Sequence, residues 1–175
     1  RAPVQVYGYP TGGSSQSVTE GIVSRIEYQS YSYGAHGLRI QVDAALNPGN
    51  SGGPAMIEAQ IAGIVFSRLR QGDNIGYLIP SEEIQLFLED IEDGKYDGKP
   101  LLLERFQKLQ NKALRQKFKL DAKTTGVLVT KPFSQNPEYP LRAGDIVTRV
   151  GEHQVDNTGR VRVETGMRVP LQYLL

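Results

Sequence analysis

Short apolar runs separated by turn-forming residues dominate the first 80 residues of this chain. Leu38, Ile40 and Val42 alternate with polar residues, and this period of two is typical of a strand with one buried face. Other runs rich in β-branched or apolar residues, bounded by Gly, Asn and Pro, cover residues 4–6, 18–26, 61–66 and 75–79. Several short strands with frequent turns predict a β-barrel or a β-sandwich.

A short amphipathic helix is expected where this β-rich region ends. Ser81 is a suitable N-cap, and the two glutamates that follow it suit the positive end of the helix dipole. Apolar residues then recur on one helical face, and Gly94 can end the helix. The turn-rich segment 95–100 predicts a linker, so we expect one domain over residues 1–97 and a second over residues 98–175.

The second domain has a mixed pattern. Residues 111–118 are helix-like, and the apolar alternation after Gly126 indicates a strand. Residues 141–151 (LRAGDIVTRVG) indicate a turn that leads into another strand. These features predict a small α+β domain.

Composition excludes several classes of function. Hydrophobic residues make up 39% and charged residues 22%, as in an ordinary globular protein. No apolar run approaches the roughly 18 residues of a membrane span. The net charge of +1 gives the whole chain no strong attraction to nucleic acid, and the absence of cysteine excludes disulfides and thiol catalysis. We expect no cofactor, no metal site, no nucleic-acid partner and no integral membrane segment.

Charge is nevertheless uneven along the chain. Residues 81–97 hold seven acidic groups against one lysine, whereas residues 101–120 hold six basic groups against one glutamate. The simpler interpretation is two solvated helix faces. A nucleic-acid contact through the basic segment at 105–119 is the alternative, although few aromatic residues accompany its charges.

The segment ALNPGNSGGPAM, residues 45–56, concentrates backbone-permissive residues around one serine, Ser51. A serine hydroxyl becomes a nucleophile only when a base removes its proton and an oxyanion hole takes up the developing charge. Glycine allows a turn in which backbone amides converge, and the amides of Gly49 and Ser51 could do so here. The alternative is a surface loop in which Ser51 is an ordinary turn residue.

Three segments together resemble the HtrA/Deg family of chymotrypsin-like serine proteases, most of all its plant-type members and their bacterial relatives. The first is IQVDAALNPGNSGGPA over 40–55, which is similar to the active-site segment of that family. The second is GYPTGG with SVTEGIVSRIE over 8–27, and the third is AGIVFS with NIGYLIPSEEI over 62–84. The resemblance implies a mainly β fold, with the second six-stranded antiparallel barrel of such a protease over residues 1–97.

The resemblance also implies roles for individual residues. Ser51 corresponds to the nucleophile, and the amides of Gly49, Asn50 and Ser51 correspond to the oxyanion hole. Residues 28–37 take the place of a regulatory loop, and residues 46–50 and 67–75 match loops that shape the site. The residues expected to line the specificity pocket are aliphatic or aromatic: Leu46, Ile64, Val65 and Phe66.

The family uses a Ser-His-Asp triad whose histidine and aspartate precede the serine, in an amino-terminal barrel. Of the two histidines here, His36 falls in the regulatory-loop position and His153 follows the turn of the second domain. Asp43 is interpreted as a structural residue that holds the loop. We therefore expect the nucleophile-bearing half of an endopeptidase, inactive by itself. The alternative is a non-catalytic module that keeps a protease scaffold and binds peptides.

Residues 98–175 resemble part of the PDZ domain that follows the protease domain in this family, chiefly through residues 141–151. Its peptide-binding loop is best matched by residues 101–104, in which Leu102 and Leu103 are the candidate site residues. Leu103 stands where a glycine is expected, and Glu104 opposes capture of a carboxylate. The alternative is that residues 101–103 form a core strand.

For the full-length enzyme, the resemblance implies ATP-independent cleavage of unfolded or damaged polypeptides, as in protein quality control, and assembly as a homo-oligomer. It leaves the compartment open. Bacterial members act outside the cytoplasm, and plant-type members act in organelles or the nucleus.

Overall fold

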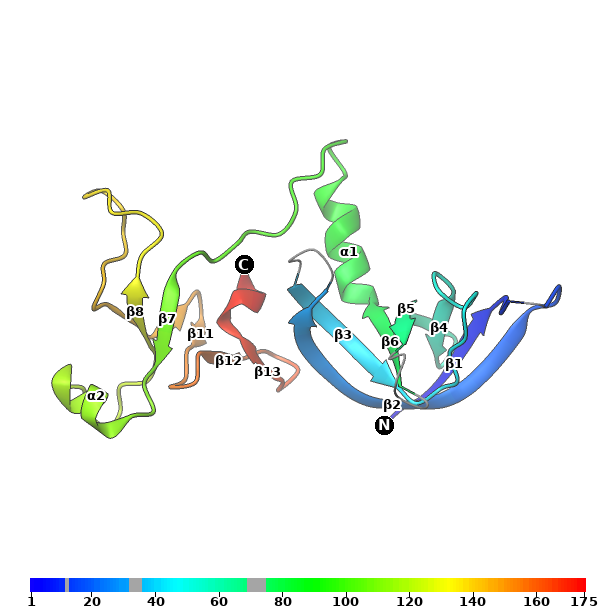
Figure 1. Ribbon diagram of the computed structural model, residues 1–175, viewed down its shortest axis with the longest axis horizontal. Coiled ribbons are helices and arrows are strands. Elements are labelled where there is room, and N and C mark those ends of the chain that lie inside the picture. The colour runs from blue at the N-terminus through cyan, green and yellow to red at the C-terminus, as the bar shows by residue number, and fades with distance from the viewer. Residues whose placement is uncertain (12, 32–35, 69–74) are drawn as a thin grey trace. The chain divides into compact units, whose positions relative to one another are not determined.

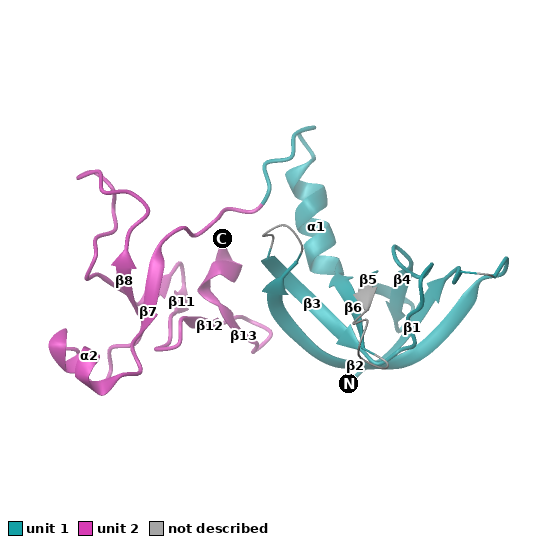
Figure 2. Ribbon diagram, viewed as in Figure 1, with its two compact units in different colours: residues 1–98 teal, residues 99–175 magenta. Residues whose placement is uncertain are grey.

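The computed structural model describes residues 1–11, 13–31, 36–68 and 75–175, with the backbone only at positions 67 and 68. Residues 32–35 of the expected regulatory loop and most of the expected loop over 67–75 lie outside the described residues. The chain divides into two compact units, residues 1–98 and residues 99–175 (Figure 2).

The first unit is a closed barrel of six antiparallel strands in the order β1-β2-β3-β6-β5-β4 (Figure 1). Closure comes from β1 and β4, which pair Gln5 with Met56 and Val6 with Ala55. The mainly β prediction is confirmed, and the open choice between barrel and sandwich is decided by this pairing. The strands are β1 Pro3–Gly8, β2 Ser17–Ser30, β3 His36–Val42, β4 Pro54–Ile57, β5 Gln60–Arg68 and β6 Gly76–Pro80.

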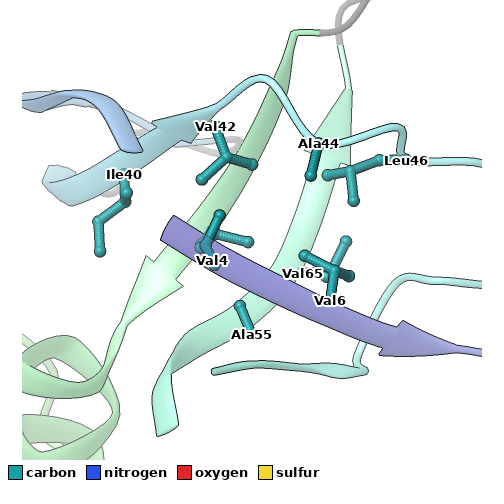
Figure 3. Close-up of a cluster of buried hydrophobic side chains, with 9 residues drawn as sticks. Val4, Val6, Ile40, Val42, Ala44, Leu46, Ala55 and Val65 are labelled. Carbon is teal, nitrogen blue, oxygen red and sulfur yellow. The ribbon is translucent and has the colours of Figure 1, made fainter. Parts of the chain in front are cut away.

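Side chains that alternate along the strands fill the barrel. Val4 and Val6 of β1 point inward together with Ile40 and Val42 of β3, as Figure 3 shows. Ala55, Val65 and Leu78 complete the cluster from β4, β5 and β6, and residues 44 and 46 add to it from the loop after β3. The polar residues between them face outward, as the period of two requires.

Helix α1, Ser81–Asp90, follows β6 directly and begins one residue earlier than expected. Pro80 takes the N-cap position without a side-chain hydrogen bond, so the prediction that Ser81 caps the helix is wrong. No residue of α1 is fully buried, and Phe87 keeps 50% of its surface exposed. In the described part of the chain, neither helix approaches the length and apolarity needed to cross a bilayer.

The second unit combines a three-stranded antiparallel sheet, β7-β8-β9, with two hairpins and a short helix. Asn111 caps helix α2, Lys112–Lys117, by accepting a hydrogen bond from the Leu114 N–H. Leu101 and Leu103 are 70% and 53% exposed and lie outside any strand, so the alternative of a core strand there is wrong. Its remaining elements are β7 Arg105–Lys108, β8 Val127–Lys131, β9 Ile146–Val147, β10 Arg149–Val150, β11 His153–Gln154, β12 Arg160–Arg162, β13 Arg168–Pro170 and the 3₁₀ helix η2 Leu171–Leu174.

Candidate functional site

Ser51 lies exposed at the head of the loop that joins β3 to β4. The loop is held by its own turn, in which the Asn50 N–H donates to the Asn47 carbonyl at 3.0 Å and the Gly53 N–H donates to the Asn50 carbonyl at 3.0 Å. It is also tied to β5, since Val65 accepts from the Gly52 N–H at 2.8 Å and donates to the Gly53 carbonyl at 2.9 Å. Ser51 is therefore presented by a loop fixed on both sides of the hydroxyl.

Glycine is required at positions 49 and 53, before and after the serine, because a Cβ at either position would collide with a backbone oxygen. Gly49 has φ of +100°, and a Cβ there would lie 2.2 Å from the Tyr9 carbonyl oxygen. Gly53 has no positive φ, but a Cβ at that position would lie 2.1 Å from the Tyr7 carbonyl oxygen. Both glycines thus let the loop approach the backbone around the end of β1, whereas no atom of the described residues lies within 4 Å of a Cβ placed at Gly52.

The three amides expected to form the oxyanion hole are not equivalent. The Asn50 N–H is already donated to the Asn47 carbonyl. Within the described residues, no hydrogen bond uses the N–H of Gly49 or of Ser51. In this conformation the set of available donors next to the hydroxyl is therefore Gly49 and Ser51, and Asn50 supports the turn.

Asn50 and Thr11 help to hold the Ser51 loop in place, a structural role that the sequence pattern did not predict for either of them. Asn50 is only 2% exposed, and its Oδ1 has no hydrogen-bond partner among the residues that the structure describes. It packs against Gly8, where a Cβ would lie 2.6 Å from that oxygen. Thr11 anchors the other side of the loop, because its N–H and its hydroxyl both donate to the Pro48 carbonyl, at 2.9 and 3.1 Å. Only the tertiary fold brings residues 8 and 11 beside residues 48–50.

The four residues expected in the specificity pocket face different directions. Leu46 and Val65 are buried in the barrel core (Figure 3). Ile64 precedes Val65 in β5 and is half-buried, with its side chain on the opposite face of the strand. Phe66 follows at a β-bulge, since Val65 pairs with Leu78 and residue 67 pairs with Tyr77. A bulge re-aims the side chain of its extra residue, and the Phe66 ring contacts the ring of Tyr31 at a centroid distance of 5.3 Å.

The remaining ionisable candidates occupy structural positions. The Asp43 carboxylate accepts a hydrogen bond from the Ile22 N–H at 2.6 Å and so joins the loop to β2. His36 begins β3 and stacks on Tyr28 at 6.2 Å between ring centroids. His153 belongs to the second unit, where its Nδ1 lies 3.1 Å from the Arg162 carbonyl oxygen.

The candidate peptide-binding loop at 101–104 precedes β7. Leu102 is half-buried and Leu103 is exposed. The Glu104 carboxylate accepts a hydrogen bond from the Tyr139 hydroxyl, and this bond raises the pKa of Tyr139 above its ordinary value. A carboxylate therefore occupies the end of the loop next to the strand.

Comparison with known proteins identifies relatives of the whole chain. The model of the trypsin-like peptidase domain matches residues 1–60, which include Ser51. The mitochondrial Protease Do-like 4 of Arabidopsis thaliana is 40% identical over 98% of this chain and 34% of its own length. The chloroplastic Protease Do-like 2 of the same plant is 42% identical over 98% of this chain and 29% of its own length. The chain thus spans about a third of the length of these relatives.

Among solved structures, the HtrA-type protease AlgW with a tripeptide is similar in fold. The TM-score is 0.70 at 24% identity, over 96% of this chain and 62% of that one. The similarity extends through both units of the chain.

Proposed function

The chain belongs to the HtrA/Deg family of trypsin-like peptidases, and on that premise we propose that it is the nucleophile-bearing half of an ATP-independent serine endopeptidase. The observation that carries this proposal is the loop around Ser51. Ser51 is exposed, five backbone hydrogen bonds hold the loop, and two amides beside the hydroxyl remain available. A surface loop without a catalytic task has no need of this combination.

In the proposed reaction Ser51 Oγ attacks the carbonyl carbon of the scissile peptide. The N–H groups of Gly49 and Ser51 stabilise the oxyanion of the tetrahedral intermediate, because fixed donors need no reorganisation as the charge develops. Asn50 is left out of the hole in this conformation because its amide is committed to the turn. The histidine base and its aspartate come, in this proposal, from sequence outside this chain, since both histidines here occupy structural positions.

We further propose that residues 98–175 form a PDZ-like domain and that Leu102 and Leu103 belong to its peptide-binding loop. Glu104, next to that loop, disfavours a ligand that places a terminal carboxylate there. The proposed substrates are unfolded or damaged polypeptides, and the proposed state of the full-length enzyme is a homo-oligomer. The relatives in Arabidopsis thaliana are described as proteases, which is consistent with this assignment.

The Ser51→Ala variant of the full-length enzyme tests the proposal. We expect cleavage of casein to be abolished. The free energy of unfolding, measured by thermal denaturation, should change by well under the roughly 1–3 kcal/mol of a buried defect, because the side chain is small and exposed. Ser81→Ala is the matched control, since it removes another exposed hydroxyl at the start of α1. Retained cleavage by Ser51→Ala would refute the nucleophile assignment and favour a non-catalytic peptide-binding module.

A further inference from the structure

The Glu83 carboxylate of α1 reaches across to strand β3. It accepts a hydrogen bond from the Leu38 N–H at 2.7 Å, and the Tyr31 hydroxyl donates to the carbonyl of the same residue. Gly37 lies between these two side chains, because a Cβ there would be 2.7 Å from the Tyr31 ring and 2.8 Å from the Glu83 carboxylate. The side chains of Tyr31, which follows β2, and of Glu83 in α1 therefore hold both backbone polar groups of Leu38.

Tyr31 connects Leu38 to strand β5. Its ring meets the Phe66 ring edge-on, with an interplanar angle of 87°. Burial, and then the negative charge of Glu83, raise the pKa of Tyr31 above its ordinary value, so the hydroxyl remains a donor at neutral pH. Phe66 is the extra residue of the β5 bulge, and its direction depends on this contact rather than on a ladder partner.

The bulge at Phe66 adjoins Val65, the residue of β5 that is hydrogen-bonded to the Ser51 loop. Val65, which precedes Phe66, exchanges two backbone hydrogen bonds with Gly52 and Gly53. Direct contacts thus run from Glu83 through Leu38 and Tyr31 to Phe66, and from the Val65 backbone to the residue after Ser51. All of them lie within the first unit.

We propose that Glu83 is a positioning residue for the Ser51 loop, acting through Tyr31, Phe66 and the backbone of Val65. The inference rests on the proposed function of Ser51. Without the Glu83 carboxylate the partly buried Leu38 N–H loses its acceptor, the Leu38 carbonyl that accepts from the Tyr31 hydroxyl is free to shift, and the bulge is free to relax. A catalytic loop must hold its donors within about 0.5 Å of their productive positions, so a small relaxation at β5 slows the chemical step.

Kinetics of the full-length enzyme test this role. We expect Glu83→Ala to lower kcat for casein peptides about 10-fold with KM changed less than about 2-fold, because the chemical step is affected and binding is not. Glu83→Gln keeps an oxygen acceptor for the Leu38 N–H and is expected to retain at least about half of the rate. Glu82→Ala removes the preceding, exposed carboxylate of the same helix and should match the wild type.

Hydrogen exchange of the chain itself provides a readout that does not depend on activity. In Glu83→Ala the amides of Leu38, Gly52 and Val65 should exchange faster than in the wild type, and in Glu82→Ala they should not. Tyr31→Leu removes the hydroxyl and the ring, and it should reproduce the faster exchange at Gly52 and Val65. It also replaces Glu83→Ala if that variant does not fold.

The outcomes separate this inference from the proposed function. A Glu83→Ala enzyme with unchanged kcat, beside an inactive Ser51→Ala enzyme, overturns the positioning role and leaves the nucleophile in place. If the wild-type full-length protein cleaves nothing, the proposed function fails, and the exchange data decide alone. Faster exchange confined to Leu38 then overturns the inference, whereas faster exchange that reaches Gly52 and Val65 supports it.

Discussion

Asn50 and Ser51 are neighbours, yet the asparagine side chain is buried and the serine is exposed. The asparagine supports the turn with its N–H and fills the space beside Gly8 with its side chain. Its Oδ1 accepts no hydrogen bond from the described part of the chain, which is a destabilising feature in a buried amide. A neutral amide costs less there than a carboxylate of the same shape, because a buried charge without a partner costs more.

At the same scale, Gly49→Ala should destabilise the chain more than Gly52→Ala. Both glycines have positive φ, so both alanines are strained by roughly 1 kcal/mol. At Gly49 the added Cβ also meets a backbone oxygen, that of Tyr9 at 2.2 Å, whereas at Gly52 no atom in the described part of the chain lies within 4 Å of the added Cβ. Urea unfolding of the two variants measures the difference. Equal destabilisation would show that the close approach to Tyr9 is not maintained in solution.

Asp156, in the second unit, makes stability depend on pH. Burial raises its pKa, but hydrogen bonds from Thr158, from the Arg168 guanidinium and from the backbone N–H groups of Thr158 and Arg160 outweigh burial and lower it to about 2. Because the folded-state pKa lies below the ordinary value of 3.8, the carboxylate stabilises the fold above about pH 4. That contribution is lost as the pH falls toward 2.

We therefore expect Asp156→Asn to lower the free energy of unfolding by roughly 1–2 kcal/mol at pH 7, after allowance for screening of this partly exposed group. The difference from the wild type should shrink between about pH 4 and pH 2, where the wild-type carboxylate becomes protonated. Urea unfolding at several pH values measures it. Glu164→Gln, an exposed carboxylate in the β12–β13 turn, is the control, and a constant difference at all pH values would contradict the assignment.

At the scale of elements, strand β5 connects the barrel core to the candidate site. Val65 contributes its side chain to the core and its backbone to the Ser51 loop. The bulge at Phe66 then turns the next side chain toward Tyr31. One strand therefore serves both packing and the site, because the Val65 side chain faces the core while its backbone bonds to the Ser51 loop.

The proposed pocket beside β5 predicts cleavage after small or medium aliphatic residues. Of its expected residues, Leu46 and Val65 are buried in the barrel core, so Ile64 and Phe66, both apolar and half-buried, remain to contact a substrate side chain. A lysine or arginine side chain placed there would lose water without gaining a partner, at a cost of several kcal/mol, whereas an aliphatic side chain would gain about 1.5–3 kcal/mol. Mass spectrometry of the peptides that the full-length enzyme releases from an unfolded protein gives the preference.

Asp43 provides the control for that prediction. Its carboxylate is held by the Ile22 N–H, so Asp43→Asn should leave the preference for aliphatic residues unchanged. A majority of cuts after lysine or arginine in the wild type, lost in Asp43→Asn, would instead identify Asp43 as the floor of the pocket.

At the scale of the whole molecule, the chain covers about a third of its plant relatives. We expect it not to turn over casein by itself, because loss of the base of a triad lowers turnover by orders of magnitude even when the oxyanion hole is intact. The apolar side chains of Val18, Ile22 and Ile26 in β2 are exposed and should promote association.

Incubation of the purified chain with casein and a fluorophosphonate probe measures this. Rapid labelling of Ser51 together with casein turnover would contradict the proposal that the other triad residues lie outside this chain. The Ser51→Ala chain is the control for labelling at other hydroxyl groups.

Local sequence patterns were sufficient to predict that the first unit is rich in β-strands and to identify residues 45–56, around Ser51, as the candidate site. Alternation at residues 38–42 identifies a strand because a half-buried strand has a period of two. The motif around Ser51 and its flanking segments identified the protease family, which the relatives confirm. These properties depend on residues close together in the chain, so the local sequence is sufficient to predict them.

Only the tertiary structure decided what depends on residues far apart in sequence. The pairing of β1 with β4 closes the barrel, and Thr11 holds the Ser51 loop by donating two hydrogen bonds to the Pro48 carbonyl. The β-bulge at Phe66 and the hydrogen bond from the Leu38 N–H to the Glu83 carboxylate likewise cannot be predicted from the order of residues along the chain. The physical reason is that a backbone N–H can donate to any of several acceptors. Packing between segments far apart in sequence selects which acceptor it uses.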